Sequence, residues 1–522
     1  MAIFFRADYS IIEKSECVIT IVFTFWPYQV RNFEIKRSII DIHFLKLRSY
    51  TSLMAKLFSK ILMHSGKNAN NTRIIDETTP LMVLAGPMFV ELLLNILINN
   101  IDTVMLSHYD EIAVGAVGNA NQVMFLLIIM FNIIATSTSV VVAQYLGAEK
   151  HDKMNMIYTL AMFVNLFFGI FLSGMLVLCA GPLMDLLNVS AEMRPGAITY
   201  INIVGGGMFI QACYNVMLQI LRCNGHSKVG MYISLAVNVI NIIGNYTFLY
   251  GPLKFLGLGV AGVAISTVVA RVVALISAVV FFYKAKIGKL SLRELKPFPT
   301  KMLGQMVKIG APSAGENLSY NLYQMVLLSF INSMGNDSVN AKVYCNSLIS
   351  FAMVFSNASA MATQIITGHL VGAGKQEAAY KRVFKTLGTS MPITVGLAFV
   401  NFLLCPITLG IFTSNENIIA LGRGIMLVDI FIEAGRCLNM TFVNSLKAAG
   451  SYIFPLIIGL ITMWGLGATV GYTLGIALGF GVAGVFAGTA TDECLRGLVV
   501  MWYWAKKKWY GKAIVKKEID EQ

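Results

Sequence analysis

Twelve long apolar segments follow one another between residues 80 and 505, and this pattern limits the possible folds of the chain more than any other feature. Each segment has more than twenty residues, the length at which a helix crosses a hydrocarbon core of about 30 Å. Only 13% of the residues are charged, whereas about a quarter of a soluble protein is charged. An outer-membrane barrel would instead show alternating segments of about ten residues. We therefore predict an all-α membrane protein with twelve transmembrane helices, at 80–106, 113–146, 155–180, 197–221, 229–250, 258–283, 303–333, 338–371, 381–410, 420–446, 453–478 and 482–505.

The basic residues cluster at the ends of the apolar segments, and their placement indicates the orientation of the chain. The net charge is +13, and roughly 22 Lys and Arg residues, Arg222 and Lys447 among them, fall on the side that holds both chain ends, against about 4 on the other side. Because cytoplasmic loops carry such an excess, we expect both termini in the cytoplasm and the protein in the inner (cytoplasmic) membrane. No basic stripe interleaves with aromatic residues, so nucleic acid is not an expected partner.

The cysteines and histidines give no sign of metal or redox chemistry. The eight Cys residues are scattered without a CxxC pair, and the six His residues form no HExxH or similar cluster. A Walker A sequence is also absent, which argues against an ATP-driven pump. We therefore predict that the protein is not an enzyme, has no cofactor and has no metal site beyond one for Na⁺.

An internal repeat is the most informative feature of the sequence. When the chain is shifted by 225 residues, Pro87 falls on Pro312 and Glu91 on Glu316. Further identities in the same register are Asn121 with Asn346, Asn132 with Asn357, Thr138 with Thr363 and Gly225 with Gly450. Six spans in each half return the chain to its starting side, so both halves have the same orientation. We predict two six-helix bundles related by a pseudo-twofold axis along the membrane normal, with a cavity between them.

The repeat and the charge pattern together predict the domain organisation. Residues 1–75 differ from the rest and include Leu53, Leu57 and Ile61 at the spacing of a short helix lying on the inner leaflet. The alternative is that residues 1–53 are a dispensable extension and that translation starts at Met54 or Met63. The predicted parts are a cytoplasmic extension (1–75), a first bundle (76–285), a cytoplasmic linker (286–301), a second bundle (302–507) and a basic cytoplasmic tail (508–522).

Residues 80–505 resemble one known family, the multidrug and toxic compound extrusion (MATE) transporters. The likeness rests on Gly-Pro-(x)3-Glu and Gly-Ala-Pro-(x)3-Glu near the starts of the first and seventh spans, and on Arg222-Cys-Asn-Gly against Lys447-Ala-Ala-Gly. The tenth- and twelfth-span stretches around Glu433 and Asp492 are similar to those of a bacterial branch. The resemblance implies export of bulky, often cationic compounds, driven by inward flow of Na⁺ or H⁺.

Ionisable side chains deep in the membrane need partners or a function, because each one costs about 2.5–3.5 kcal/mol on insertion scales. Glu91 and Glu316 each follow a proline by one helical turn, and we expect Pro87 and Pro312 to bend their helices. Glu316 has no basic residue within one helical turn in its own span, so we expect it to be unpaired and to exchange protons. The predicted ion-coupling residues are Glu316, Glu91, Glu433, Asp429 and Asp492.

Alternative roles remain open for these carboxyls. Glu91 and Glu316 are also compatible with protonated, structural hydrogen-bond donors. Arg436 lies three residues from Glu433, and Arg496 four residues from Asp492, which is compatible with fixed ion pairs. Characterised Na⁺-coupled relatives use a seventh-helix Glu with a tenth-helix Asp. Here the tenth span offers Asp429 and Glu433 in a different register, which leaves the choice between Na⁺ and H⁺ open.

Polar residues within the spans are candidates for a substrate cavity between the bundles, with hydrogen bonding between helices as the alternative. The predicted cavity residues are Asn121, Asn346, Asn357, Tyr320, Tyr323 and Gln364. Gly205–Gly207 interrupt the fourth span, and we favour helix packing over bending as their role.

The leading hypothesis is a monomeric secondary antiporter. It would export amphiphilic organic cations in exchange for H⁺ or Na⁺ by rocking one bundle against the other. A flippase for lipid-linked sugars ranks second because it would need a strongly cationic cavity, and Arg271 is the one mid-span Arg outside the carboxylate clusters.

Overall fold

The computed structural model describes residues 75–250 and 257–515, which belong to one compact unit formed by residues 68–522. The predicted surface helix around residues 53–61 and the end of the basic tail lie outside these described residues. Within them the structure is helical, with no strand. The predicted all-α class is therefore confirmed.

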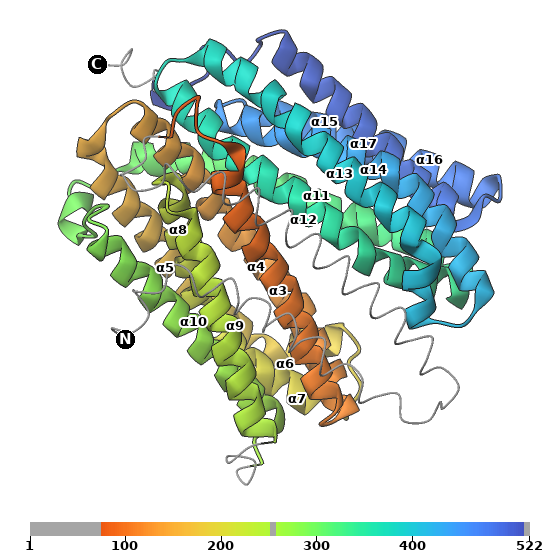
Figure 1. Ribbon diagram of the computed structural model, residues 1–522. Coiled ribbons are helices and arrows are strands. Elements are labelled where there is room, and N and C mark those ends of the chain that lie inside the picture. The colour runs from red at the N-terminus through yellow and green to blue at the C-terminus, as the bar shows by residue number, and fades with distance from the viewer. Residues whose placement is uncertain (1–74, 251–256, 516–522) are drawn as a thin grey trace, which may run out of the picture. The chain divides into compact units, whose positions relative to one another are not determined.

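The first half of the described unit contains six spans (Figure 1). Five of them are single helices, and the fourth is a broken one. The spans are α3 (Leu81–Ser107), α4 (Glu111–Gly147), α5 (Met154–Leu178), the series α7 (Arg194–Tyr200), a π-helical turn (Ile201–Gly205) and α8 (Met208–Cys223), then α9 (Ser227–Leu249) and α10 (Gly259–Lys284). The short helix α6 (Ala180–Leu186) connects α5 to α7.

The second half repeats this plan after a linker that contains one 3₁₀ turn (Leu292–Leu295). Its spans are α11 (Thr300–Asn332), α12 (Asn336–Gly372), α13 (Gln376–Phe412), α14 (Glu416–Ala448), the series α15 (Ile453–Leu460), a π-helical segment (Ile461–Gly467), α16 (Ala468–Tyr472) and a second π-helical segment (Thr473–Ala477), then α17 (Gly481–Ala505). All twelve predicted spans coincide with observed helices, with ends that agree to within about five residues.

Eight described helices are long and apolar enough to cross a membrane, or nine if the bent fourth span is counted as one. The helices α11, α14 and α17 are not among them, although they are long. These three carry Glu316, the Glu433–Arg436 stretch and the Asp492–Arg496 stretch. Charges buried inside the protein therefore contribute to their lower hydropathy.

The fourth span bends by 44° between its two helical parts. Gly206 and Gly207 form the break, immediately after the π-helical turn. Gly205 also packs against Leu176, where an added Cβ would lie 2.7 Å from a side-chain carbon. The expectation that these glycines serve packing was therefore incomplete, because the segment both packs and bends. Pro87 and Pro312 lie inside the continuous helices α3 and α11.

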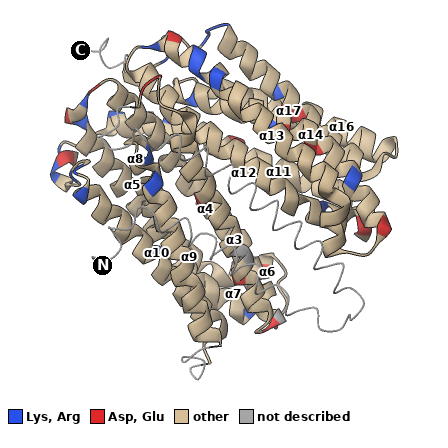
Figure 2. Cartoon of the chain, viewed as in Figure 1, with Lys and Arg blue, Asp and Glu red and all other residues tan. Residues whose placement is uncertain are grey.

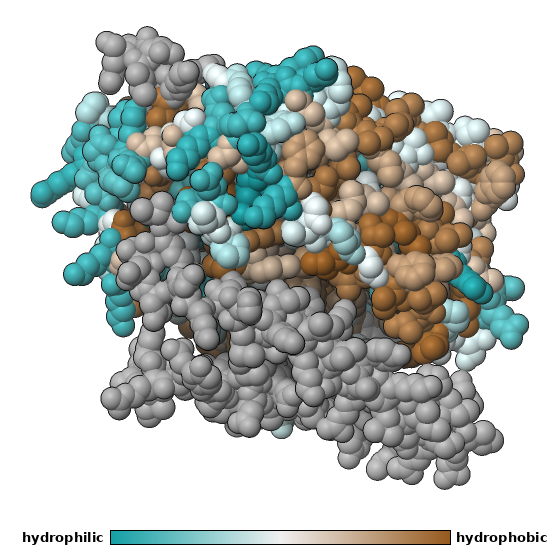
Figure 3. Space-filling view, turned by 45° about the horizontal axis from the view of Figure 1, so that its top comes forward, coloured by the Kyte–Doolittle hydropathy of each residue, from teal (hydrophilic) through white to brown (hydrophobic). Residues whose placement is uncertain are grey.

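The two halves meet along α3 and α4 on one side and α11 and α12 on the other (Figure 1). The helices α4, α8, α12 and α14 end together at Gly147, Cys223, Gly372 and Ala448, and residues 506–515 lie at the same end. We call this end the linker side. Figure 2 shows Lys and Arg gathered at one end of the helices, and Figure 3 shows hydrophilic residues at that end and hydrophobic residues over much of the remaining visible face.

Candidate functional site

The second half buries an unusual number of charged side chains among α11, α14 and α17. Each of them is at most 8% exposed. They are the acidic residues Glu316, Asp429, Glu433, Asp492 and Glu493 and the basic residues Arg436, Lys447 and Arg496. When all are ionised, five carboxylates face three cations, so the cluster has an excess of two negative charges. Burial of uncompensated charge is strongly unfavourable, so the cluster is suited to take up cations.

Glu316 lies between two basic side chains. Its Oε2 is 2.8 Å from Lys447 Nζ, and its Oε1 is 3.7 Å from Arg496 Nη1. The expectation that Glu316 is unpaired was wrong. Both partners come from other helices, so the composition of the span that holds Glu316 gives no sign of them. An ion-paired carboxylate of this kind is held in its ionised form and exchanges protons poorly.

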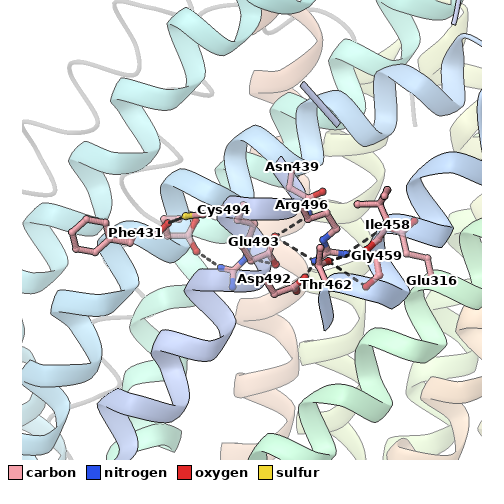
Figure 4. A network of polar contacts seen from close by, with 12 residues as sticks. Glu316, Phe431, Asn439, Ile458, Gly459, Thr462, Asp492, Glu493, Cys494 and Arg496 are labelled. Carbon is pink, nitrogen blue, oxygen red and sulfur yellow. Dashed lines mark hydrogen bonds and ion pairs between the residues drawn. The ribbon is translucent and has the colours of Figure 1, made fainter. Parts of the chain in front are cut away.

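Arg496 lies at the centre of the cluster (Figure 4). Its Nη2 is 3.0 Å from Asp492 Oδ2 and 3.5 Å from Glu493 Oε2, so one guanidinium compensates charges on three carboxylates including Glu316. Gly459 on α15 leaves room for this guanidinium, since an added Cβ would lie 3.3 Å from Nη1. The predicted pairing of Asp492 with Arg496 is present.

A second guanidinium compensates the adjoining carboxylates. Arg436 forms a short ion pair with Glu433, one helical turn earlier, and its Nε is 3.9 Å from Glu493 Oε1. Asn439 Nδ2 also donates to Glu493 Oε2 at 2.8 Å. Fixed partners therefore hold both Glu433 and Glu493. The ion pair of Glu433 agrees with its three-residue spacing from Arg436.

Asp429 is the exception in the cluster. Its side chain is 1% exposed, yet neither carboxylate oxygen has a hydrogen-bond partner among the described residues. Asp429 lies one turn before Glu433 on α14 and lines a cavity of about 280 Å³. Of the predicted ion-coupling residues, Asp429 is thus the one that lines the cavity without a hydrogen-bond partner in the described part of the chain, and Arg436 of the same cavity wall interacts with it electrostatically.

This cavity lies inside the second half, whereas the predicted one lies between the two bundles and stays a prediction. Its walls come from α11, α12, α14 and α17. Of the predicted cavity residues, Tyr320 and Asn346 line it. The others lie elsewhere: Tyr323 and Gln364 are buried, Asn357 is half-buried and Asn121 is exposed. The sequence pattern could not separate these groups, because polar residues on long spans share the same composition.

The first half contains a simpler version of the same arrangement. Glu91 on α3 accepts from Arg222 Nη2 on α8 at 2.7 Å, and both side chains are buried. The pairs Glu91–Arg222 and Glu316–Lys447 are related by the 225-residue repeat in both members. Arg222 and Lys447 are therefore buried ion-pair partners and not loop charges, which corrects their use in predicting the orientation. The excess of basic residues on the linker side persists without them.

Asp102 on α3 was not identified from the sequence. Asn245 Nδ2 on α9 donates to its Oδ1 at 2.7 Å and also reaches Asn241 Oδ1 at 3.2 Å. Arg271 on α10 interacts electrostatically with this carboxylate. The repeat could not reveal Asp102, because its counterpart 225 residues later is Leu327. Its acidic side chain within an apolar span was the available signal.

Comparison with known proteins places these features in context. The family model MatE matches residues 87–247 and again residues 312–473, so its two copies start 225 residues apart. An uncharacterised transporter, YisQ of Bacillus subtilis (strain 168), is 37% identical over 440 residues, which cover 84% of this chain and 96% of that protein. The multidrug resistance protein PmpM of Pseudomonas aeruginosa is 22% identical and covers 77% of this chain and 85% of its own length.

Solved structures show the same fold. A MATE protein crystallised in the straight conformation superposes with a TM-score of 0.76 at 21% identity, covering 83% of this chain and 96% of its own. A MOP superfamily transporter from Pyrococcus furiosus superposes equally well, with a TM-score of 0.76 at 20% identity and the same coverage. The twelve-helix architecture is thus shared with these transporters.

The duplicated ion pair leads to a stability prediction. We expect Glu91→Gln to destabilise the protein by about 3–5 kcal/mol, because it leaves Arg222 buried without a counter-charge. The double variant Glu91→Gln/Arg222→Gln should recover most of the lost stability. Thermal unfolding of the purified protein in detergent measures both changes. If the separate effects of Glu91→Gln and Arg222→Gln simply add in the double variant, the two side chains do not stabilise each other.

Proposed function

Because the chain belongs to the MatE family, we propose that it is a secondary antiporter that exports small organic compounds in exchange for H⁺ or Na⁺. Members of this family are transporters and not enzymes. The finer assignment to cation-driven export is supported by the charge distribution of the second half. Its buried cluster has two more carboxylates than cations, whereas the buried pair Glu91–Arg222 in the first half is balanced.

The observation that carries the proposal is the unpartnered carboxylate of Asp429 at the cavity wall. A buried ionised carboxylate without a partner is unfavourable, so it favours a proton, a Na⁺ ion or a positively charged substrate group beside it. These ligands compete for one negative charge. We infer that the coupling cation and the substrate bind there in alternation, which is what exchange requires. The difference in ion affinity between the two open states then drives the cycle.

The remaining carboxylates have a different role in this proposal. Glu316, Glu433 and Glu493 each face a fixed basic partner, so they hold Arg436, Arg496 and Lys447 in place. Of these three basic residues, Arg436 lines the cavity. Asp492 shares Arg496 with Glu316 and Glu493, and its Oδ1 has no hydrogen-bond partner among the described residues. The ion site is therefore centred on Asp429, with Asp492 as the next candidate.

The cavity also suggests the chemistry of the substrate. Apolar side chains such as Leu327, Ile349 and Phe486 line it, in keeping with an amphiphilic compound. Lys342 lines it as well, and its ammonium group has no ion-pair partner among the described residues. Asp429 attracts a positive group, while Lys342 attracts a negative one. We therefore propose that amphiphilic zwitterions bind in addition to the amphiphilic cations expected from the family resemblance.

The orientation remains a proposal with a physical basis. Basic loops favour the cytoplasm, and the linker side carries most of the Lys and Arg residues. We place that side, and both termini, in the cytoplasm of a bacterial cell. The protein would then act as a monomer in the inner membrane, with the rocking motion of its halves opening the two sides in turn.

The coupling proposal predicts the behaviour of Asp429→Asn. In proteoliposomes, substrate should dissipate an imposed pH gradient or an imposed Na⁺ gradient through the wild-type protein, and the variant should lose at least about 90% of this response. The amide keeps the shape of the side chain but cannot carry the charge on which exchange depends. A suitable probe is an esterified rhodamine, which is a fluorescent amphiphilic cation.

Asp337→Asn is the matched control, because Asp337 is a half-buried residue of the same half that contacts Asn415 and lies outside the cavity lining. It should leave the response unchanged. Undiminished exchange by Asp429→Asn would remove this carboxylate from coupling. Transport that ignores both gradients in the wild type would favour the flippase alternative.

The substrate proposal predicts a selective effect of Lys342→Met. The same rhodamine can be supplied as its ester, which is a cation, and as its free acid, which is a zwitterion. We expect the variant to bind the free acid about tenfold or more weakly, since a hydrogen bond to a charged group contributes about 1.5–3 kcal/mol. Binding of the ester should not weaken. Equal losses for both dyes, measured by fluorescence polarisation, would contradict a direct contact between Lys342 and the acid group.

A further inference from the structure

Two hydrogen bonds cross between the halves at the linker side. Gln144 on α4 donates from Nε2 to the carbonyl oxygen of Ala448 at 2.6 Å. His369 on α12 lies with its Nε2 2.9 Å from the carbonyl oxygen of Cys223. Because a carbonyl only accepts, the His369 ring must carry its proton on Nε2. Each half thus contributes one donor and one acceptor.

The 225-residue repeat relates the two bonds to each other. Gln144 corresponds to His369, and Cys223 corresponds to Ala448. The donor residue types differ between the halves, whereas the geometry of the contact is kept. Because the repeat relates all four positions, the same contact is present in both halves although the donor residues differ.

The acceptors are helix-terminal carbonyls. Cys223 is the last residue of α8, and Ala448 is the last residue of α14. The final carbonyls of a helix have no partner within it and must bond to something else. Here a side chain of the opposite half provides the partner. When the halves separate on this side, water can bond to both the donor and the acceptor, so each hydrogen bond can break and reform.

Close backbone approach brings the donors into range. A Cβ added to Gly147 would overlap the backbone of His369, and one added to Gly372 would overlap the backbone of Gln144. These glycines are also related by the repeat. The ends of α4 and α12 therefore pack backbone against backbone, with no side chain between them.

Two further features connect this contact to the rest of the molecule. Arg222 and Lys447, the partners of Glu91 and Glu316, immediately precede the two acceptor residues. The C-terminal segment adds a third bond on one side, because the Ile514 backbone N–H donates to Gln144 Oε1 at 2.8 Å. Ile514 is buried, so this segment is part of the contact.

We propose that Gln144 and His369 are positioning residues for transport and form a two-part latch that holds the linker side closed. This inference rests on the proposed exchange mechanism, in which the two sides must open in turn. The latch sets the balance between the two states without touching substrate or coupling ion. Each half of the latch is anchored next to a buried ion pair, so α8 and α14 move with it.

Alkylation of Cys223 tests the latch directly. This residue is fully buried, with its carbonyl in the latch and its thiol against Ser139 of α4, and we expect the thiol to become accessible when the linker side opens. The experiment uses the full chain in nanodiscs, with the other seven cysteines replaced and a water-soluble maleimide as the probe. We expect His369→Leu and Gln144→Leu each to raise the alkylation rate about 2- to 10-fold, the loss of one net hydrogen bond. The double variant should multiply the two effects.

Two control variants separate the latch from general destabilisation. His369→Gln places the residue of the first half in the second, and it should keep the slow wild-type rate. Thr367→Val removes a buried hydroxyl of α12 that has no hydrogen-bond partner among the described residues, and it should also leave the rate unchanged. Unchanged alkylation in the folded double variant, or equal acceleration by Thr367→Val, would overturn the proposal. Because the assay contains no substrate or gradient, its failure leaves the exchange mechanism untouched.

Discussion

Burial of charge inside a membrane protein is the constraint on which this structure depends. Glu91 and Glu316 are far from water, and each is held by a basic side chain that reaches it from another helix. Because an unpaired ion in such a place is strongly unfavourable, these pairs connect α3 to α8 and α11 to α14. The packing of each half follows from them as much as from its apolar surface.

The two halves share this arrangement but differ in how far they extend it. In the first half the buried carboxylate of Glu91 has a counter-charge in Arg222, whereas the second half adds carboxylates on α14 and α17 without enough cations to balance them. Duplication thus provides a common scaffold, and divergence of one copy provides the buried negative charge at which we propose that a cation exchanges. The crossed contacts of Gln144 and His369 follow the same pattern, because both halves keep the contact but use different donor residues.

Much of the fold could be predicted from the sequence, because long apolar spans, loop charges and a repeat are all local or periodic signals. The partners of the buried charges could not be predicted in this way. The position of Lys447 at the end of a span predicts a loop charge, yet its side chain reaches Glu316 on another helix. The signal was present in the repeat, where an acid and a base keep the same spacing in both halves. Asp102 and the latch donors have no residue of the same type at the repeat-related position, so the sequence does not reveal their partners.

Competition between cation and substrate for Asp429 is the central claim, and equilibrium binding tests it most directly. The dissociation constant of the purified protein for an esterified rhodamine should be measured over a series of pH values and Na⁺ concentrations. We predict that it rises up to tenfold for each tenfold increase in one of these cations, and that Asp429→Asn abolishes this dependence. A wild-type dissociation constant independent of both cations, or an unchanged dependence in the variant, would contradict the account.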